Sequence, residues 1–85
     1  MKIETVRKAS KGSPALHLLK NEEGVIIGML EKYRNTRTEQ HPWKAFLGVG
    51  ERTAYLGAFY NLTNFDGKQE AINLIARQHD ARQAA

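Results

Sequence analysis

The sequence predicts an α+β fold in which an antiparallel sheet of three to five strands packs against one C-terminal helix. Up to about residue 60, short apolar segments alternate with turn-forming residues, and beyond residue 68 the apolar residues recur at helical spacing. A chain of 85 residues buries only about 60% of its unfolded surface, so one sheet covered by one helix is an economical core. We expect a single domain, 1–85, with N-terminal strands and a hairpin in 1–32 and a three-stranded sheet plus helix in 33–82.

The first half of the chain predicts three strands. Residues 2–9 are rich in β-branched side chains, which favour a strand, and the Ser-Lys-Gly-Ser-Pro cluster at 10–14 ends it. Residues 15–20 and 25–33 flank the sequence Asn-Glu-Glu-Gly at 21–24, which is typical of a hairpin loop. The second arm is at first apolar on both faces, as in a central strand.

The second half predicts two more short strands. Residues 34–42 are polar and indicate a loop or an irregular, exposed strand. Residues 43–48 and 54–60 form the strands, and Val-Gly-Glu-Arg at 49–52 joins them as a hairpin. A turn-rich link over 61–67 leads to the helix.

The helix is predicted from residue 68 onward. Asp66 can cap its first turn, with Gln69 completing a capping box. One stripe of residues recurs at helical spacing and is expected to face the sheet; it comprises Ala71, Leu74, Ile75 and Gln78, with Ile72, Ala76 and His79 beside it.

Charge is unevenly distributed along the chain, whose net charge is +4 and whose pI is about 9.6. Residues 1–20 hold five basic and one acidic residue, residues 21–31 hold three acidic and no basic ones, and residues 32–52 hold five basic and two acidic ones. Two basic stretches separated by an acidic turn indicate a one-sided positive surface, as polyanion binding requires. The alternative is ordinary solvated charge at a net value that favours solubility.

Strand alternation in 43–48 assigns side chains to two faces. Trp43, Ala45 and Leu47 share one face, and Lys44, Phe46 and Gly48 share the other. If Trp43 faces the helix, Lys44 and Phe46 face outward beside Tyr55. An outward Phe46 could stack on unpaired bases, or another part of the chain or a partner could cover it; the remaining alternative places Phe46 in the core.

Several motifs occur in a recognisable order. They are Tyr33-Arg34-x-x-Arg37, Trp43-x-Ala45, Arg52, Tyr55-Leu56-Gly57-x-Phe59 and a helix opening at Glu70-Ala71. In this order, over roughly half the chain, they resemble the Apetala-type (ethylene-response-factor) DNA-binding domain. The resemblance implies a three-stranded antiparallel sheet on a helix, with the free sheet face in the major groove of DNA.

The same resemblance implies roles for individual residues. Arg34 and Arg37 match the positions from which the family's first strand reaches bases and phosphates, and Tyr55 matches an aromatic residue that touches the DNA. Several features depart from the family pattern. Glu39 lies where further basic residues are expected, Arg52 is shifted by one position, and Phe46 and Gly48 lie where the second strand usually presents polar groups. The turn over 61–67 is longer than in the family, and residues 1–32 have no counterpart.

We therefore predict a small, non-enzymatic nucleic-acid-binding protein, with DNA as the favoured partner. The predicted contact residues are Arg34, Arg37, Lys44, Phe46, Arg52 and Tyr55, with Lys32, Arg7, Lys8 and Lys11 contacting phosphates. The alternative is a phage-type protein–protein inhibitor or interaction module acting on a host enzyme or defence complex, using the same aromatic and arginine residues. A further alternative is a homodimer formed through an edge strand. The small size suggests a phage or mobile-element protein.

Other chemistry is not indicated by the sequence. The three histidines lack metal-ligand spacing, no nucleophile has a neighbouring base, and no glycine-rich phosphate loop precedes a helix. We expect no catalytic residues, no metal and no cofactor. The chain has no cysteine, no apolar N-terminal signal and no apolar run near the roughly 20 residues of a membrane span. These features predict a cytoplasmic protein without a membrane partner.

Overall fold

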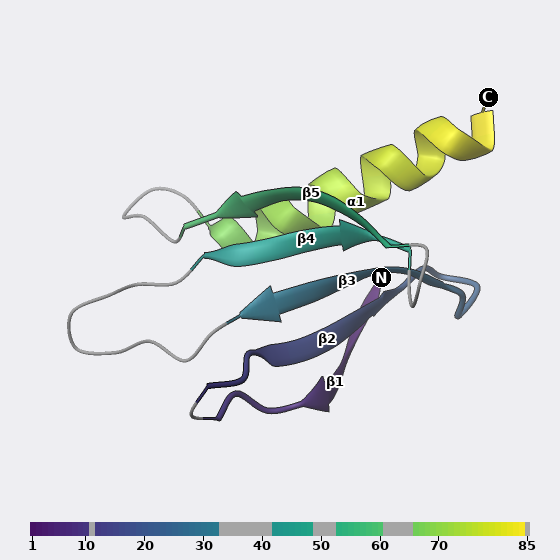
Figure 1. Cartoon of the computed structure of the whole chain (residues 1–85). Helices are drawn as coiled ribbons and strands as arrows, with labels where there is room; N and C mark the ends of the chain where they lie inside the picture. The colour runs from purple at the N-terminus through teal and green to yellow at the C-terminus, as the bar shows by residue number, and fades with distance from the viewer. Residues whose placement is uncertain (11, 33–41, 49–52, 61–65, 85) are drawn as a thin grey trace.

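The computed structural model describes residues 1–10, 12–32, 42–48, 53–60 and 66–84. The described residues form a five-stranded antiparallel sheet packed against one C-terminal helix (Figure 1), which confirms the predicted fold class. The elements are β1 (Lys2–Arg7), β2 (Ala15–Lys20), β3 (Ile26–Lys32), β4 (Trp43–Leu47), β5 (Ala54–Phe59) and α1 (Gly67–Ala84).

Each strand pairs with the next strand in the sequence, so the order in the sheet is β1-β2-β3-β4-β5. Helix α1 packs against β3, β4 and β5 on one face of this sheet (Figure 1). No helix in the described part of the chain is long and apolar enough to cross a membrane.

The hairpin loop between β2 and β3 follows from the chemistry of two residues. The side-chain oxygen of Asn21 accepts hydrogen bonds from the backbone N–H groups of Glu23 and Val25, both at 3.0 Å. Gly24 has a φ of 81°, in the left-handed region that glycine adopts without a steric penalty. The predicted hairpin loop at 21–24 is confirmed.

The core lies between α1 and the strands beneath it. Its buried members are Leu19, Ile27, Leu30, Ala45, Leu47, Ala71 and Ile75. The helix approaches β3 closely because position 28 is glycine. A β-carbon on Gly28 would lie 2.5 Å from Cγ2 of Ile75 and 2.5 Å from the carbonyl oxygen of Phe46.

The start of α1 agrees with the predicted cap. The carboxylate of Asp66 accepts a hydrogen bond from the backbone N–H of Gln69 at 3.1 Å. The side chain of Gln69 donates to Asn73 at 2.9 Å, one helical turn further along, which is a contact that the predicted capping box did not include.

The predicted buried stripe of α1 is wrong at Gln78. Ala71 and Ile75 are fully buried, but Gln78 is exposed and His79 is half-buried. The buried stripe therefore follows a four-residue spacing from Ala71 through Ile75 to His79. Residues four apart share a helix face, and Gln78 falls at its exposed margin.

Candidate nucleic-acid interface

The side of the sheet opposite α1 is the candidate interface, and we call it the open face. Ala45 and Leu47 are buried against the helix, so the residues that alternate with them point to the opposite side. Cross-strand partners in neighbouring strands point to the same face of the sheet. Four such partners on the open face therefore lie in one line across β2 to β5. We call this line the apolar row; it comprises Leu18 of β2, Met29 of β3, Phe46 of β4 and Tyr55 of β5.

Phe46 and Tyr55 form an aromatic pair within the apolar row. Their ring centroids lie 5.5 Å apart with an angle of 57° between the planes. Tyr55 is 59% exposed, and Phe46 is half-buried and does not belong to the buried core. The expected outward position of Phe46 beside Tyr55 is therefore confirmed, and the alternative that Phe46 is a core residue is wrong.

A β-bulge in β5 determines which of its side chains reach the open face. Ala45 pairs with Gly57 and Phe46 pairs with Tyr55, so β5 contains one more residue than β4 between these pairs. After this bulge, the residues of β5 that point to each face of the sheet are shifted by one position. Leu56 and Phe59 pack against the core, whereas Tyr55 and Ala58 are exposed.

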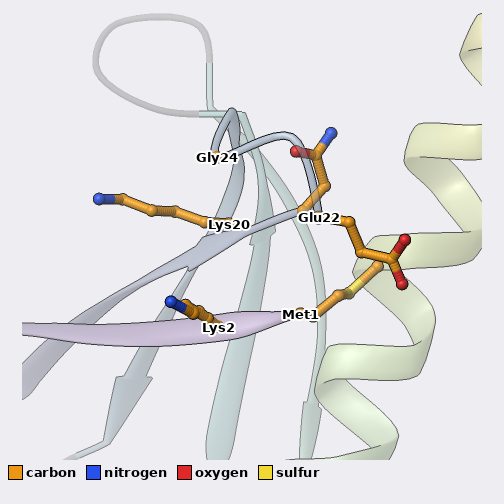
Figure 2. Close-up of a pocket in the computed structure, with 6 residues that line it drawn as sticks. Met1, Lys2, Lys20, Glu22 and Gly24 are labelled. Atoms are coloured by element: carbon orange, nitrogen blue, oxygen red, sulfur yellow. The ribbon is translucent and has the colours of Figure 1, made fainter.

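Charged residues of both signs surround the apolar row. The neighbouring line contains Glu31 of β3 and its cross-strand partner Lys44 of β4. On β1 and β2, Glu4 forms an ion pair with Lys20, whose cross-strand partner is Lys2. Figure 2 shows Lys2 and Lys20 projecting away from α1, whereas Glu22 lies toward it. The described part of the open face is therefore mixed in charge, with an apolar centre, rather than uniformly positive.

The structure brings together three of the predicted contact residues. Lys44, Phe46 and Tyr55 lie on neighbouring strands of the open face. Arg7 is the last residue of β1, the edge strand opposite β5, and Lys8 follows it. The Arg7 guanidinium donates to the carbonyl oxygen of Pro14 at 3.0 Å. The remaining predicted contact residues lie outside the described residues; they are Lys11, Arg34, Arg37 and Arg52.

Lys32 belongs to the opposite side of the sheet. It is the cross-strand partner of Trp43, and its ammonium group lies 6.0 Å from the centre of the Trp43 ring. Trp43 shares its face with the buried Ala45 and packs against the core under α1. Because Lys32 pairs with Trp43, its side chain lies on the helix side of the sheet. Lys44 and Tyr55 lie on the other side, so Lys32 is not part of the same surface.

Trp43 is the centre of a cluster on the helix side that the sequence did not indicate. The Lys68 ammonium group lies 5.5 Å from the ring centre, and the ring of His17 lies 5.5 Å away at an angle of 39°. Among the residues that the structure describes, the buried ring N–H of Trp43 has no hydrogen-bond partner. His17 also hydrogen-bonds with the Thr5 hydroxyl at 3.0 Å.

Burial and charge affect the titratable groups of this cluster. Burial, and to a smaller extent the positive charge of Lys68, hold the pKa of His17 below its usual value. Burial also lowers the pKa of Lys32. The neutral form of His17 is favoured because a proton on its ring would be partly desolvated and would lie close to another cation.

Sequence reasoning did not identify Leu18 and Met29 as members of the candidate site. Leu18 lies in a strand where apolar residues occupy consecutive positions, so alternation within that strand does not reveal its outward direction. Only the pairing of Leu18 with Met29, and of Met29 with Phe46, places them in the apolar row.

No protein-family model, curated protein or solved structure matches this chain. Among the residues that the structure describes, no three histidine or carboxylate side chains are grouped so as to hold a metal ion. Function is therefore inferred from the open face itself.

Proposed function

We propose that this protein binds nucleic acid, with DNA favoured, through the open face of its sheet, and that it does so without catalysis. The observation that carries this proposal is the Phe46–Tyr55 pair beside Lys44, on a sheet face that the helix leaves uncovered. Exposed aromatic rings provide surfaces on which bases stack, a contact of about 1–3 kcal/mol per base. An adjacent ammonium group supplies a partner for phosphate.

Two further features support the proposal. The net charge of +4 attracts a polyanion over distances of about a Debye length, roughly 10 Å at 0.1 M salt. The order of β4, β5 and α1 is also the order that the resemblance to the Apetala-type domain implies.

Fluorescence anisotropy with labelled single-stranded and duplex DNA and RNA, measured across a range of salt concentrations, tests this function. We expect binding at low salt that weakens steeply between about 50 and about 200 mM salt, because cations that contact phosphates displace condensed counterions. Lys44→Ala should reduce the slope of log affinity against log salt by about one. Arg34→Ala and Arg37→Ala test the predicted contacts outside the described residues in the same way.

The matched control is Arg77→Ala, because Arg77 is an exposed cation on α1, behind the sheet. This variant has the same net charge as Lys44→Ala but leaves the open face unchanged. Equal effects of the two variants would indicate attraction by net charge alone. Failure of the protein to bind any nucleic acid at low salt would eliminate the proposed function.

A second function, a protein–protein inhibitor or interaction module, is favoured by the composition of the apolar row. Leu18 and Met29 extend the aromatic pair into a continuous apolar strip with charges of both signs beside it. Protein interfaces commonly combine such an apolar centre with a polar rim. This function predicts binding to a protein partner that is lost in Tyr55→Ala and changes little with salt.

A further inference from the structure

We infer that the nucleic acid bound on the open face is single-stranded, and that its unpaired bases lie along the apolar row. The backbone of the strand would then cross the sheet at a large angle to β2–β5. This inference rests on the proposed function and specifies its ligand.

The apolar row has the shape of a short single-stranded segment. Its four residues come from four consecutive strands and occupy one register line. Neighbouring strands lie about 4.8 Å apart, so the row extends for about 14 Å across the sheet. Four-stranded sheets that carry aromatic residues on one face stack about two or three unpaired bases in this manner. The row therefore has the dimensions of a short single-stranded segment.

The centre of the open face carries aromatic and apolar side chains. Phe46 and Tyr55 offer aromatic rings, and Met29 beside Phe46 offers a polarisable thioether side chain. These groups favour the flat faces of bases. In a duplex the base faces are already stacked on one another, and only the base edges and the phosphates are accessible. If a duplex lay on the apolar row, its base edges and phosphates would have no polar partners there.

Charges of both signs lie beside the apolar row. Lys44 lies in the register line next to the apolar row, and Lys2 and Lys20 lie toward the other end of the sheet. Glu31 is the cross-strand partner of Lys44, and Glu4 pairs with Lys20. These carboxylates oppose a broad phosphate surface of the kind that a duplex presents. A single strand can instead direct its bases toward the row and its phosphates toward the Lys44 side.

The test compares variants of Tyr55 in binding to three probes of equal length: a labelled oligothymidine, a labelled abasic strand and a labelled hairpin duplex. We expect oligothymidine to bind more tightly than either other probe at the same salt concentration. Tyr55→Ala should weaken oligothymidine binding by about 5- to 150-fold and leave duplex binding unchanged. Tyr55→Phe should retain the affinity, because it keeps the ring.

Tyr60→Ala is the matched control. Tyr60 is 50% exposed, close to the 59% of Tyr55, but it lies five positions further along the chain, roughly 16 Å along an extended strand. Its removal should not change oligothymidine binding. Far-UV circular dichroism and thermal unfolding should show that all three tyrosine variants stay folded, because both tyrosines are exposed. Phe46→Leu, which keeps an apolar side chain but removes the ring, is a second variant that should weaken oligothymidine binding.

The outcomes separate this inference from the proposed function. If the abasic strand or the duplex binds as tightly as oligothymidine, or if Tyr55→Ala has no effect on oligothymidine, the single-strand inference is overturned and nucleic-acid binding stands. If none of the probes binds at low salt, the proposed function and this inference are both overturned.

Discussion

Gly28 of β3 lies directly beneath Ile75 of α1, with no room for a side chain between them. A β-carbon at position 28 would meet Cγ2 of Ile75 and the carbonyl oxygen of Phe46, each at 2.5 Å. The second obstacle is backbone of β4, which cannot move without disturbing the sheet. The separation of helix and sheet therefore depends on the absence of a side chain at position 28.

Gly28→Ala should lower the free energy of unfolding by about 1–3 kcal/mol, because the added methyl group overpacks the contact between α1 and β3. Urea unfolding followed by circular dichroism measures this change. Ile75→Val in the same chain should not restore stability, because valine keeps the γ-carbons and the Phe46 carbonyl oxygen still blocks the methyl group. Unchanged stability of Gly28→Ala would contradict the close approach of α1 to β3.

The Asp66 cap gives a second prediction. Asp66→Ala removes the acceptor for the backbone N–H of Gln69, and the free energy of unfolding should fall by about 1 kcal/mol. Asp66→Asn keeps an acceptor oxygen and should retain most of that stability. If the two variants are equally destabilised, the helix dipole rather than the hydrogen bond is responsible.

The Phe46–Tyr55 pair gives a third prediction, which does not depend on any ligand. A double-mutant cycle with Phe46→Leu and Tyr55→Leu should yield a coupling free energy of about 0.5–1.5 kcal/mol, because the tilted rings attract one another beyond their burial. Urea unfolding of the four proteins measures it. A coupling energy near zero would indicate that the rings do not interact in solution.

His17 gives a fourth prediction, on the dependence of stability on pH. The pKa of His17 is lowered in the folded protein by burial and then by Lys68, so the unfolded chain binds a proton at higher pH than the folded one. This contribution to stability is fully present above the unfolded pKa of about 6.5. It is lost progressively as the pH falls from about 6.5 toward the lower folded pKa.

Urea midpoints between about pH 8 and about pH 5 should therefore fall less in His17→Gln than in the unaltered protein. Titration of the His17 ring by NMR provides an independent measurement. Lys68→Gln should raise the pKa of His17 toward its usual value, since the neighbouring positive charge is removed. A pKa of His17 that does not respond to Lys68→Gln would contradict the electrostatic contact.

Much of the fold could be predicted because local chemistry determines it. Asn21 and Gly24 specify the hairpin loop through contacts within the same few residues, and Asp66 specifies the start of α1 in the same way. The outward direction of Phe46 also follows from alternation within one strand, with the buried Ala45 beside it.

The remaining features depend on contacts between segments that are distant in the sequence. The side on which Lys32 lies is set by its pairing with Trp43, because alternation in an arm that is apolar on both faces does not identify the buried side. Gly57, an isolated glycine within a strand, is a local signal for the bulge at Leu56 and Gly57. That the bulge turns Phe59 toward the core follows only from the pairing of β5 with β4. Gln78 and His79 are neighbours in the sequence of α1, and the packing of α1 on the sheet determines that His79 is half-buried and Gln78 is exposed.

The order of the strands determines which part of the molecule opens most easily. In the sheet formed by the described residues, β1 is an edge strand that pairs with β2, and every residue of β1 except Ile3 is exposed. Helix α1 rests on β3, β4 and β5, so β1 can detach without lifting the helix. Amide protons of β1 should consequently exchange with deuterated solvent when β1 alone separates from β2. Those of β3 and β4 should exchange much later, because their exposure requires unfolding of the whole core.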